Sequence, residues 1–412
     1  MATRAERWAF LRAVRAGDVE RVCRLLASAH DPAGRAGRSI RCRDGGRRSM
    51  LAVAVEHGHA DLVPVLLAAG ASPHRRRWAR DALLPVVFAT GDRHLVRAVL
   101  AATASVEWDV EEREAALFEA VRLDRPDLLD LLDLTGVAAK ALGTEAAWAA
   151  AVGAAAAVRW LLGRGVSPDH VACPDDGETL LHRAASGSAA TSVAVLLGAG
   201  ADPEARDRLG RTALMRAAYS AGPVDPSLSV LLDAGADATV TDDAGLDALD
   251  HLRASAGDGP VDEMSAARRL RAAGASGQPA ADRAVVRAAR NGDAAALRRA
   301  LADGGSPSAA TVTKRGGTER PLTLAGRHVD LTCLRLLLDA GADPDKGGSD
   351  GPPVVILSAA GKQRALGVLL DAGADVHAIG PGGTTALAAA EAAARPDVAA
   401  LLRDRGATSG GT

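Results

Sequence analysis

The 412-residue sequence predicts an all-α fold: an α-solenoid of about twelve stacked helix-turn-helix units with short β-hairpin-like fingers between them. Three observations lead to this prediction. The segment Leu-Leu-x-x-Gly-Ala-Asp recurs along the chain, a second glycine precedes it at a fixed distance, and apolar residues between the two fall at helical spacing. A unit that recurs every ~33 residues is typical of helical hairpins stacked in a line.

The recurring segment marks the end of each unit. Its glycine position, called the anchor here, lies 29 to 41 residues from the next anchor. Clear copies of the segment stand at Leu66–Ala71, Leu196–Pro203, Leu231–Asp237, Leu337–Pro344 and Leu369–Asp375, and weaker copies place the anchor at Ala29, Thr103, Gly136, Gly165, Gly274, Gly304 and Gly406. Because a left-handed glycine commonly ends a helix, each anchor should end the second helix of its unit.

The second glycine predicts the turn between the two helices of a unit. It lies twelve residues before the anchor in six units, at Gly17, Gly58, Gly91, Gly153, Gly292 and Gly361. The leucine pair that follows is expected to fill a core shared between neighbouring units. Truncation of Leu197 or Leu232 to alanine should then cost about 2–5 kcal/mol.

The first helix of several units opens with a residue suited to an N-cap, namely Ser49, Thr179 and Thr385. The openings Thr179-Leu180-Leu181-His182-Arg183-Ala184 and Arg320-Pro321-Leu322-Thr323-Leu324-Ala325, together with the closing segment, resemble the ankyrin repeat. The resemblance covers nearly the whole chain, although residues 104–136 have no opening motif. It implies paired helices with extended fingers at which such arrays usually meet partner proteins.

The array is predicted to have two parts, 4–275 and 283–406, with a possible junction at 276–282 and a flexible tail at 407–412. The segment Ala284–Asp293 reads like Ala9–Asp18, which begins the first part, and Gly274 is followed by no finger of ordinary length. The alternative is one continuous superhelix with a shortened finger.

Composition favours a cytoplasmic protein. The first residues carry charges, and no apolar run reaches the length of a signal or membrane segment. The cysteines are far apart in the sequence and suggest no disulfide framework. Arginine greatly outnumbers lysine, which together with abundant alanine points to a bacterial genome rich in G and C. We expect a monomer, because nothing in the sequence indicates a second copy.

The sequence predicts no enzyme, no cofactor and no metal site. His57 and His59 bracket a turn glycine, and the remaining histidines show no His-x-x-x-His spacing. The segment Asp343–Lys346 carries acidic residues like those of a calcium loop, but Val354 stands where that loop needs a glutamate. These residues are expected to serve the fold.

Charge distribution supplies the candidate binding site. Residues 31–80 contain ten arginines against four acids, a net of +6, and residues 81–136 carry a net of −7. We predict protein binding through the fingers, with an arginine cluster beside a tryptophan as the contact: Arg43, Arg47, Arg48, Arg75, Arg76, Arg77 and Trp78. Two alternatives remain, namely phosphate or nucleic-acid binding by the same arginines, which predicts steep salt dependence, and an ordinary solvated surface.

Overall fold

The computed structural model describes residues 4–28, 49–74, 82–220, 226–256, 261, 264–312 and 317–408. Its internal contacts divide the chain into two compact units, Met1–Ala172 with Ala194–Ala201 and Cys173–Val193 with Asp202–Thr412. Each unit is described by itself.

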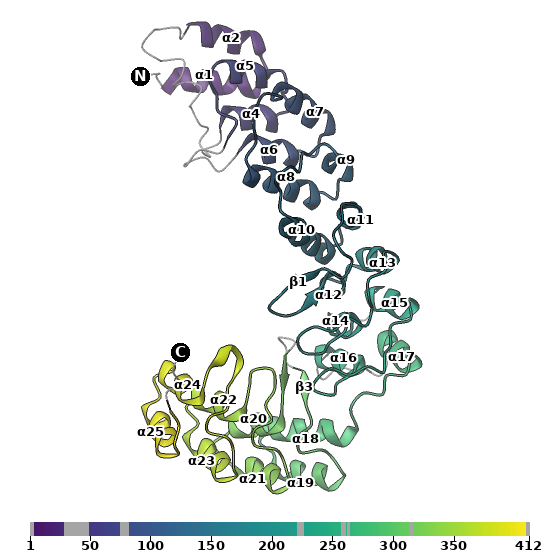
Figure 1. Ribbon diagram of the computed structural model, residues 1–412, viewed down its shortest axis with the longest axis vertical. Coiled ribbons are helices and arrows are strands. Elements are labelled where there is room, and N and C mark those ends of the chain that lie inside the picture. Colours follow the sequence, from purple (N-terminus) through teal and green to yellow (C-terminus); the bar gives the residue numbers. More distant parts are fainter. Residues whose placement is uncertain are drawn as a thin grey trace. The chain divides into compact units, whose positions relative to one another are not determined.

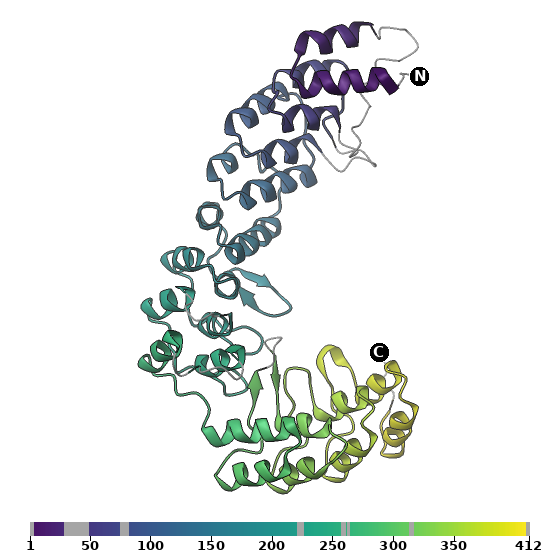
Figure 2. The same ribbon diagram turned by 180° about the vertical axis from the view of Figure 1, so that it is seen from behind.

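The first unit is a stack of helix pairs (Figures 1 and 2). The first helices of successive pairs pack on one another in chain order, and α5, α7, α9 and α11 pack in a second row. The first helices are α1 (Arg4–Arg15), α4 (Met50–Glu56), α6 (Leu83–Ala89), α8 (Val110–Arg122) and α10 (Ala139–Val152). The second helices are α2 (Val19–Ser28), α5 (Leu62–Ala68), α7 (Arg93–Ala102), α9 (Pro126–Leu129) and α11 (Ala155–Gly163).

The second unit has the same construction. Its first helices are α12 (Leu180–Ser186), α14 (Ala213–Ser220), α16 (Ala248–Ala256), α18 (Ala280–Asn291), α20 (Pro321–Gly326), α22 (Pro353–Ala359) and α24 (Ala386–Ala392). Its second helices are α15 (Pro226–Asp233), α17 (Ser265–Ala272), α19 (Ala294–Ala302), α21 (Thr332–Asp339), α23 (Gln363–Asp371) and α25 (Pro396–Asp404). Helix α13 (Ala190–Gly198) has residues in both units. The prediction of a mostly helical stack is confirmed.

Strands are short and lie in the fingers. Strands β1 (Val171–Cys173) and β2 (Glu178–Thr179) pair, as do β3 (Thr311–Val312) and β4 (Thr318–Glu319). The second pair is antiparallel, with Thr311 opposite Glu319 and Val312 opposite Thr318. A short 3₁₀ helix, η2 (Pro381–Gly383), lies in the last finger. The β-hairpin-like fingers of the prediction are present in the described residues.

Within the second unit, helices α12, α14 and α16 pack in one run, and α18, α20, α22 and α24 pack in another. Strand β3 packs on α16, and a small apolar cluster of Leu246, Ala310 and Val312 joins the two runs. Of residues 276–282, where the sequence predicts a junction, 276–279 lie between the runs and 280–282 begin α18. The division into 4–275 and 283–406 stays a prediction.

The two leucines of each closing segment lie in different environments. In the described copies the first leucine is fully buried, as in Leu66, Leu231, Leu337 and Leu369, whereas the second is only partly buried. Successive side chains of a helix point about 100° apart, so one of the two faces the core squarely and the other lies at its edge. The expectation that both leucines fill the core is therefore wrong for the second, which includes Leu197 and Leu232.

The turn between the helices of a unit is left-handed. All six predicted turn glycines have positive φ, from +68° at Gly17 to +86° at Gly153. In three other helix pairs the residue twelve positions before the anchor is Asp124, Ser188 or Ala394, with φ of 52°, 54° and 52°. The turn therefore persists where glycine is absent. The anchor at Thr103 is different, because its φ is −111° and its hydroxyl donates to the Val99 carbonyl at 2.8 Å.

All three residues predicted as N-caps occupy that position with extended backbone, and in two of them the hydroxyl accepts from an N–H group of the helix. The Ser49 hydroxyl accepts from the Ala52 N–H at 3.1 Å, and the Thr385 hydroxyl accepts from the Ala388 N–H at 3.2 Å. Thr179 precedes α12 as expected, but its hydroxyl lies 2.9 Å from His182 Nδ1. Its side chain therefore takes part in the network described in the next subsection.

Truncation of the buried leucine should cost more than truncation of its neighbour. We expect Leu231→Ala to lower the free energy of unfolding by about 2–5 kcal/mol, because Leu231 is fully buried between helices. Leu232→Ala should cost less, since Leu232 is partly exposed. Urea unfolding followed by circular dichroism measures both, and equal losses would contradict the assignment.

The turn at Ala394 should be improved by glycine. A left-handed conformation costs an L-residue roughly 1–2 kcal/mol, so Ala394→Gly should stabilise the chain by about 0.5–1 kcal/mol after the added flexibility of the unfolded chain is deducted. The neighbouring Ala393, with φ of −85°, is the control, and Ala393→Gly should destabilise. Thermal unfolding gives the signs, and a lower midpoint for Ala394→Gly would refute this account of the turn.

Candidate functional site

The sequence-predicted contact surface lies outside the described residues. This holds for Arg43, Arg47, Arg48, Arg75, Arg76, Arg77 and Trp78 alike. His74, the last described residue before Arg75, lies next to this surface. Its Nδ1 is 2.9 Å from the buried Glu112 Oε2, and its ring lies edge-on to Trp108 at 5.6 Å between centroids. Glu112 therefore connects the finger at residue 74 to helix α8.

The histidines that bracket the first turns contact the backbone. His57 Nδ1 lies 2.9 Å from the Val53 carbonyl, and His59 Nε2 lies 2.9 Å from the Arg15 carbonyl in the preceding pair. His328 makes the same contact to the Arg290 carbonyl at 2.9 Å. A side chain just after the turn thus connects neighbouring helix pairs. Among the described residues, no group of three His, Cys, Asp or Glu side chains could hold a metal ion.

A buried charge network holds the fingers next to α12 and α14. Asp207 Oδ2 accepts from Arg211 Nε at 2.8 Å and from Arg216 Nη2 at 3.0 Å, and Arg216 also pairs with Glu178. Burial by itself would raise the pKa of Asp207, but the charge of Arg211, its backbone N–H and Arg216 hold that pKa below its ordinary value. The Asp207 carboxylate therefore stays ionised inside the finger.

His182 completes this network. Its Nε2 lies 2.8 Å from the Arg211 carbonyl and its Nδ1 lies 2.9 Å from the Thr179 hydroxyl. Burial lowers the pKa of His182, so the ring is neutral near pH 7. The finger before α14 is also joined to the finger before α12 through the backbone, because the Arg208 N–H donates to the Asp176 carbonyl at 2.8 Å. The polar residues here fix the fingers on α12 and α14.

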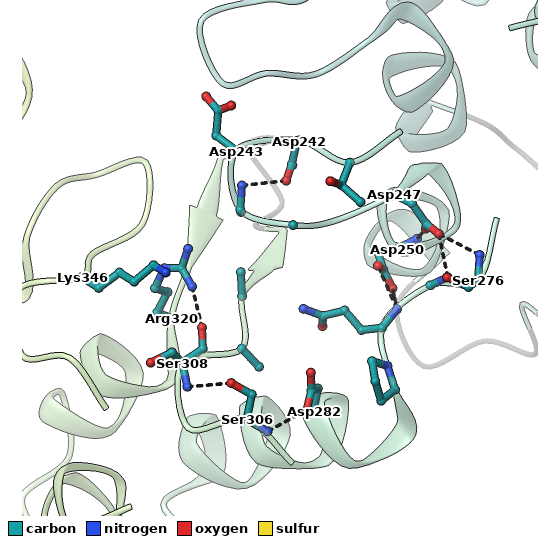
Figure 3. A pocket seen from close by; sticks show the side chains of 18 residues that line it. Asp242, Asp243, Asp247, Asp250, Ser276, Asp282, Ser306, Ser308, Arg320 and Lys346 are labelled. Carbon is teal, nitrogen blue, oxygen red and sulfur yellow. Dashed lines mark hydrogen bonds between the residues drawn. The ribbon is translucent and has the colours of Figure 1, made fainter. Parts of the chain in front are cut away.

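A polar cavity of about 540 Å³ lies farther along the second unit (Figure 3), between the finger before α16 and the residues around β3. Five aspartates line it, against Arg320 and Lys346: Asp242, Asp243, Asp247, Asp250 and Asp282. The charged side chains of the lining therefore sum to −3 when all of them are ionised.

Most of these carboxylates are already used by the chain. Asp247 accepts from the Ser276 and Gly277 N–H groups at 2.9 and 2.6 Å, and Asp250 accepts from the Gln278 N–H at 2.8 Å. Asp242 Oδ2 lies 3.0 Å from His251 Nε2, and Asp282 accepts from the Ser306 N–H at 2.7 Å. Burial raises the pKa of Asp250. The cavity is a product of how residues 276–278 are tied to α16, and it shows no catalytic arrangement.

The sequence reasoning missed both polar networks. The signal that could have found them is an aspartate early in the finger before the first helix, as at Asp207 and Asp242, with a basic residue or histidine four or nine positions later. That spacing brings the acid and its partner together only because the finger folds back over the helix. None of the helices in the described part of the chain combines the length and the apolar character needed to cross a bilayer.

Removal of the Asp207 carboxylate should leave Arg211 and Arg216 without their shared partner. Asp207→Ala is expected to lower the free energy of unfolding by about 3–5 kcal/mol, because two buried cations then lose compensation. Asp243→Ala, which removes an exposed carboxylate, is the control and should have a small effect. Chemical unfolding compares the two. A loss below about 1 kcal/mol for Asp207→Ala would show that the network contributes little.

Comparisons with known proteins show what the chain is similar to. Residues 146–242 match the family model described as ankyrin repeats (3 copies). No curated protein matches the chain. Among solved structures, the human ASB11 ankyrin repeat domain is 21% identical, with 64% of this chain and 99% of that chain covered and a TM-score of 0.27. The ankyrin repeat domain of Bcl-3, of the IkappaB protein family, is 22% identical, with 64% and 97% covered and a TM-score of 0.36.

The matched segment contains the helix pairs of α12 and α14 with their charge network. On both sides of it, the described chain continues as helix pairs with the same left-handed turns. The chain therefore carries ankyrin repeats, which the family model matches over residues 146–242.

Proposed function

We propose that the protein is a non-catalytic scaffold that binds another protein through its fingers and the face formed by its first helices. Ankyrin repeats generally serve protein–protein interaction, and the chain carries this repeat. The proposal includes a monomer that acts in the cytoplasm of a bacterium, which rests on the sequence alone.

The observation that carries the proposal is that described fingers of the second unit are fixed before any partner arrives. The carboxylates of Asp207, Asp242 and Asp247 are turned inward onto arginine, histidine or backbone N–H groups. A surface held in this way loses little conformational freedom when it binds, so the ordering cost of association is low. Outward residues on such a frame can differ from unit to unit and select the partner.

The arginine cluster remains our proposed contact within this function. Its seven residues carry a strong positive charge, and the net of −7 over residues 81–136 follows directly in the sequence. A partner with an acidic surface would be attracted to the cluster and repelled from the next segment, which fixes the orientation of approach. Arginine and tryptophan are also the residues in which binding energy most often concentrates.

Charge reversal tests this contact. The triple variant Arg75→Glu, Arg76→Glu and Arg77→Glu should weaken capture of a protein partner by at least about 30-fold, which corresponds to ~2 kcal/mol. The matched control reverses three exposed arginines on second helices of the second unit, Arg298, Arg335 and Arg364, and should leave capture unchanged. Affinity capture with mass spectrometry identifies the partner, and titration of the purified pair gives the dissociation constants.

Two other outcomes would contradict the proposed contact, and they can be told apart. Equal losses in both triple variants would mean that only net charge matters and would refute the arginine contact. A shift of nucleic acid at physiological salt, lost in the first variant and steeply dependent on salt, would replace protein binding with the nucleic-acid alternative.

A further inference from the structure

A second, smaller cavity lies in the first unit between the first helices α8 and α10, which pack side by side in their row. It encloses about 320 Å³. Leu117 of α8 and Ala138 and Ala141 at the start of α10 give it apolar walls, and Glu114 and Glu145 bring one carboxylate from each helix. The cavity therefore combines an apolar wall with two acids on facing helices.

Glu145 is in an unfavourable state in this cavity. Its Oε2 is buried and has no hydrogen-bond partner among the described residues. A buried acceptor without a donor costs about 1–3 kcal/mol, and more when it is charged, so such an atom calls for an explanation. Burial and, after it, the charge of Glu114 raise the pKa of Glu145 to about 7. The described residues therefore lack a hydrogen-bond donor for Glu145 Oε2.

We propose that this cavity receives the arginine side chain of a partner protein, with the guanidinium between Glu114 and Glu145 and the aliphatic stem along Leu117, Ala138 and Ala141. The inference rests on the proposed function, because it names a chemical feature of the partner.

Charge and shape favour this occupant. With Lys140, which also lines the cavity, the charged side chains sum to −1 when both carboxylates are ionised, and one guanidinium brings the site to neutrality. Arginine suits the site better than lysine because its planar group donates in several directions at once and is more weakly hydrated. Its stem can cover apolar surface while the charged end meets the carboxylates.

Two other cations, on α8 and on the neighbouring α11, do not line the cavity. Arg113 of α8 donates to the Thr135 carbonyl and lies 3.6 Å from Asp133, and Arg159 of the neighbouring α11 is exposed. Lys140 lies one turn from Thr144, whose hydroxyl donates to the Lys140 carbonyl at 3.0 Å. The groups that face Glu145 within the cavity are therefore Glu114 and Lys140.

Binding should depend on pH in a defined direction. A cation favours the ionised form of Glu145, so it lowers the pKa of that carboxyl and is bound more weakly where the carboxyl is protonated. The affinity should be full above about pH 8 and fall as the pH drops through 7 toward 5.5, by roughly tenfold or more. Glu145→Gln removes both the charge and this dependence.

The test uses two peptides that differ in charge alone, Ac-Ala-Arg-Ala-NH₂ and its neutral isostere with citrulline in place of arginine. The full-length chain, labelled with ¹³C at the glutamate carboxyl carbons, is titrated with each by NMR, and Glu145→Gln assigns the signal of Glu145. The arginine peptide should shift this signal with a dissociation constant on the order of 1 mM and lower the apparent pKa of Glu145, whereas the citrulline peptide should do neither.

Variants locate the binding. Glu114→Gln and Glu145→Gln should each weaken the arginine peptide at least about tenfold, whereas Glu111→Gln, which removes an exposed carboxylate from the same helix α8 outside the cavity, should not. Equal binding of the two peptides, no shift of the Glu145 signal at about 10 mM peptide, or equal effects of all three variants would overturn the proposal. If the chain still captures a partner protein in that case, the scaffold function stands and only the arginine pocket fails.

Discussion

Each helix pair has apolar surface on two sides and can bury it only against the pairs before and after it. The leucine at the first position of each closing pair and the small alanines of the first helices supply that surface. Because burial depends on neighbours, the direction in which each pair leaves its turn must be the same along a run. A left-handed residue at the turn provides this constancy, and it is kept even where the residue is Asp124, Ser188 or Ala394.

The fingers depend on a different interaction. They are too short to have a core of their own, and carboxylates such as Asp207 and Asp247 hold them by accepting hydrogen bonds from arginine side chains and backbone N–H groups. Buried charges of this kind are costly unless they are paired, so their geometry is strict. The result is a surface whose shape is settled in advance, which lowers the ordering cost of binding another protein.

The two cavities differ in what their acids do. In the second unit most of the aspartates are occupied by the chain itself, and the cavity follows from the path of residues 276–278. In the first unit Glu145 has a buried oxygen without a hydrogen-bond partner among the described residues, and burial together with the charge of Glu114 raises its pKa. An unsatisfied acid on the face of the first helices is a feature that a binding partner can complete.

The sequence by itself determined the helical pairs, their stride, the turn glycines and the N-cap positions, because these depend on contacts within about a dozen residues. It also indicated the arginine cluster, which remains a proposal. Only the tertiary structure decided which leucine of each pair is buried, how Arg216 is shared between Asp207 and Glu178, and that Glu114 and Glu145 share one cavity. These features depend on how one helix pair packs against the next, and that packing joins residues far apart in the chain.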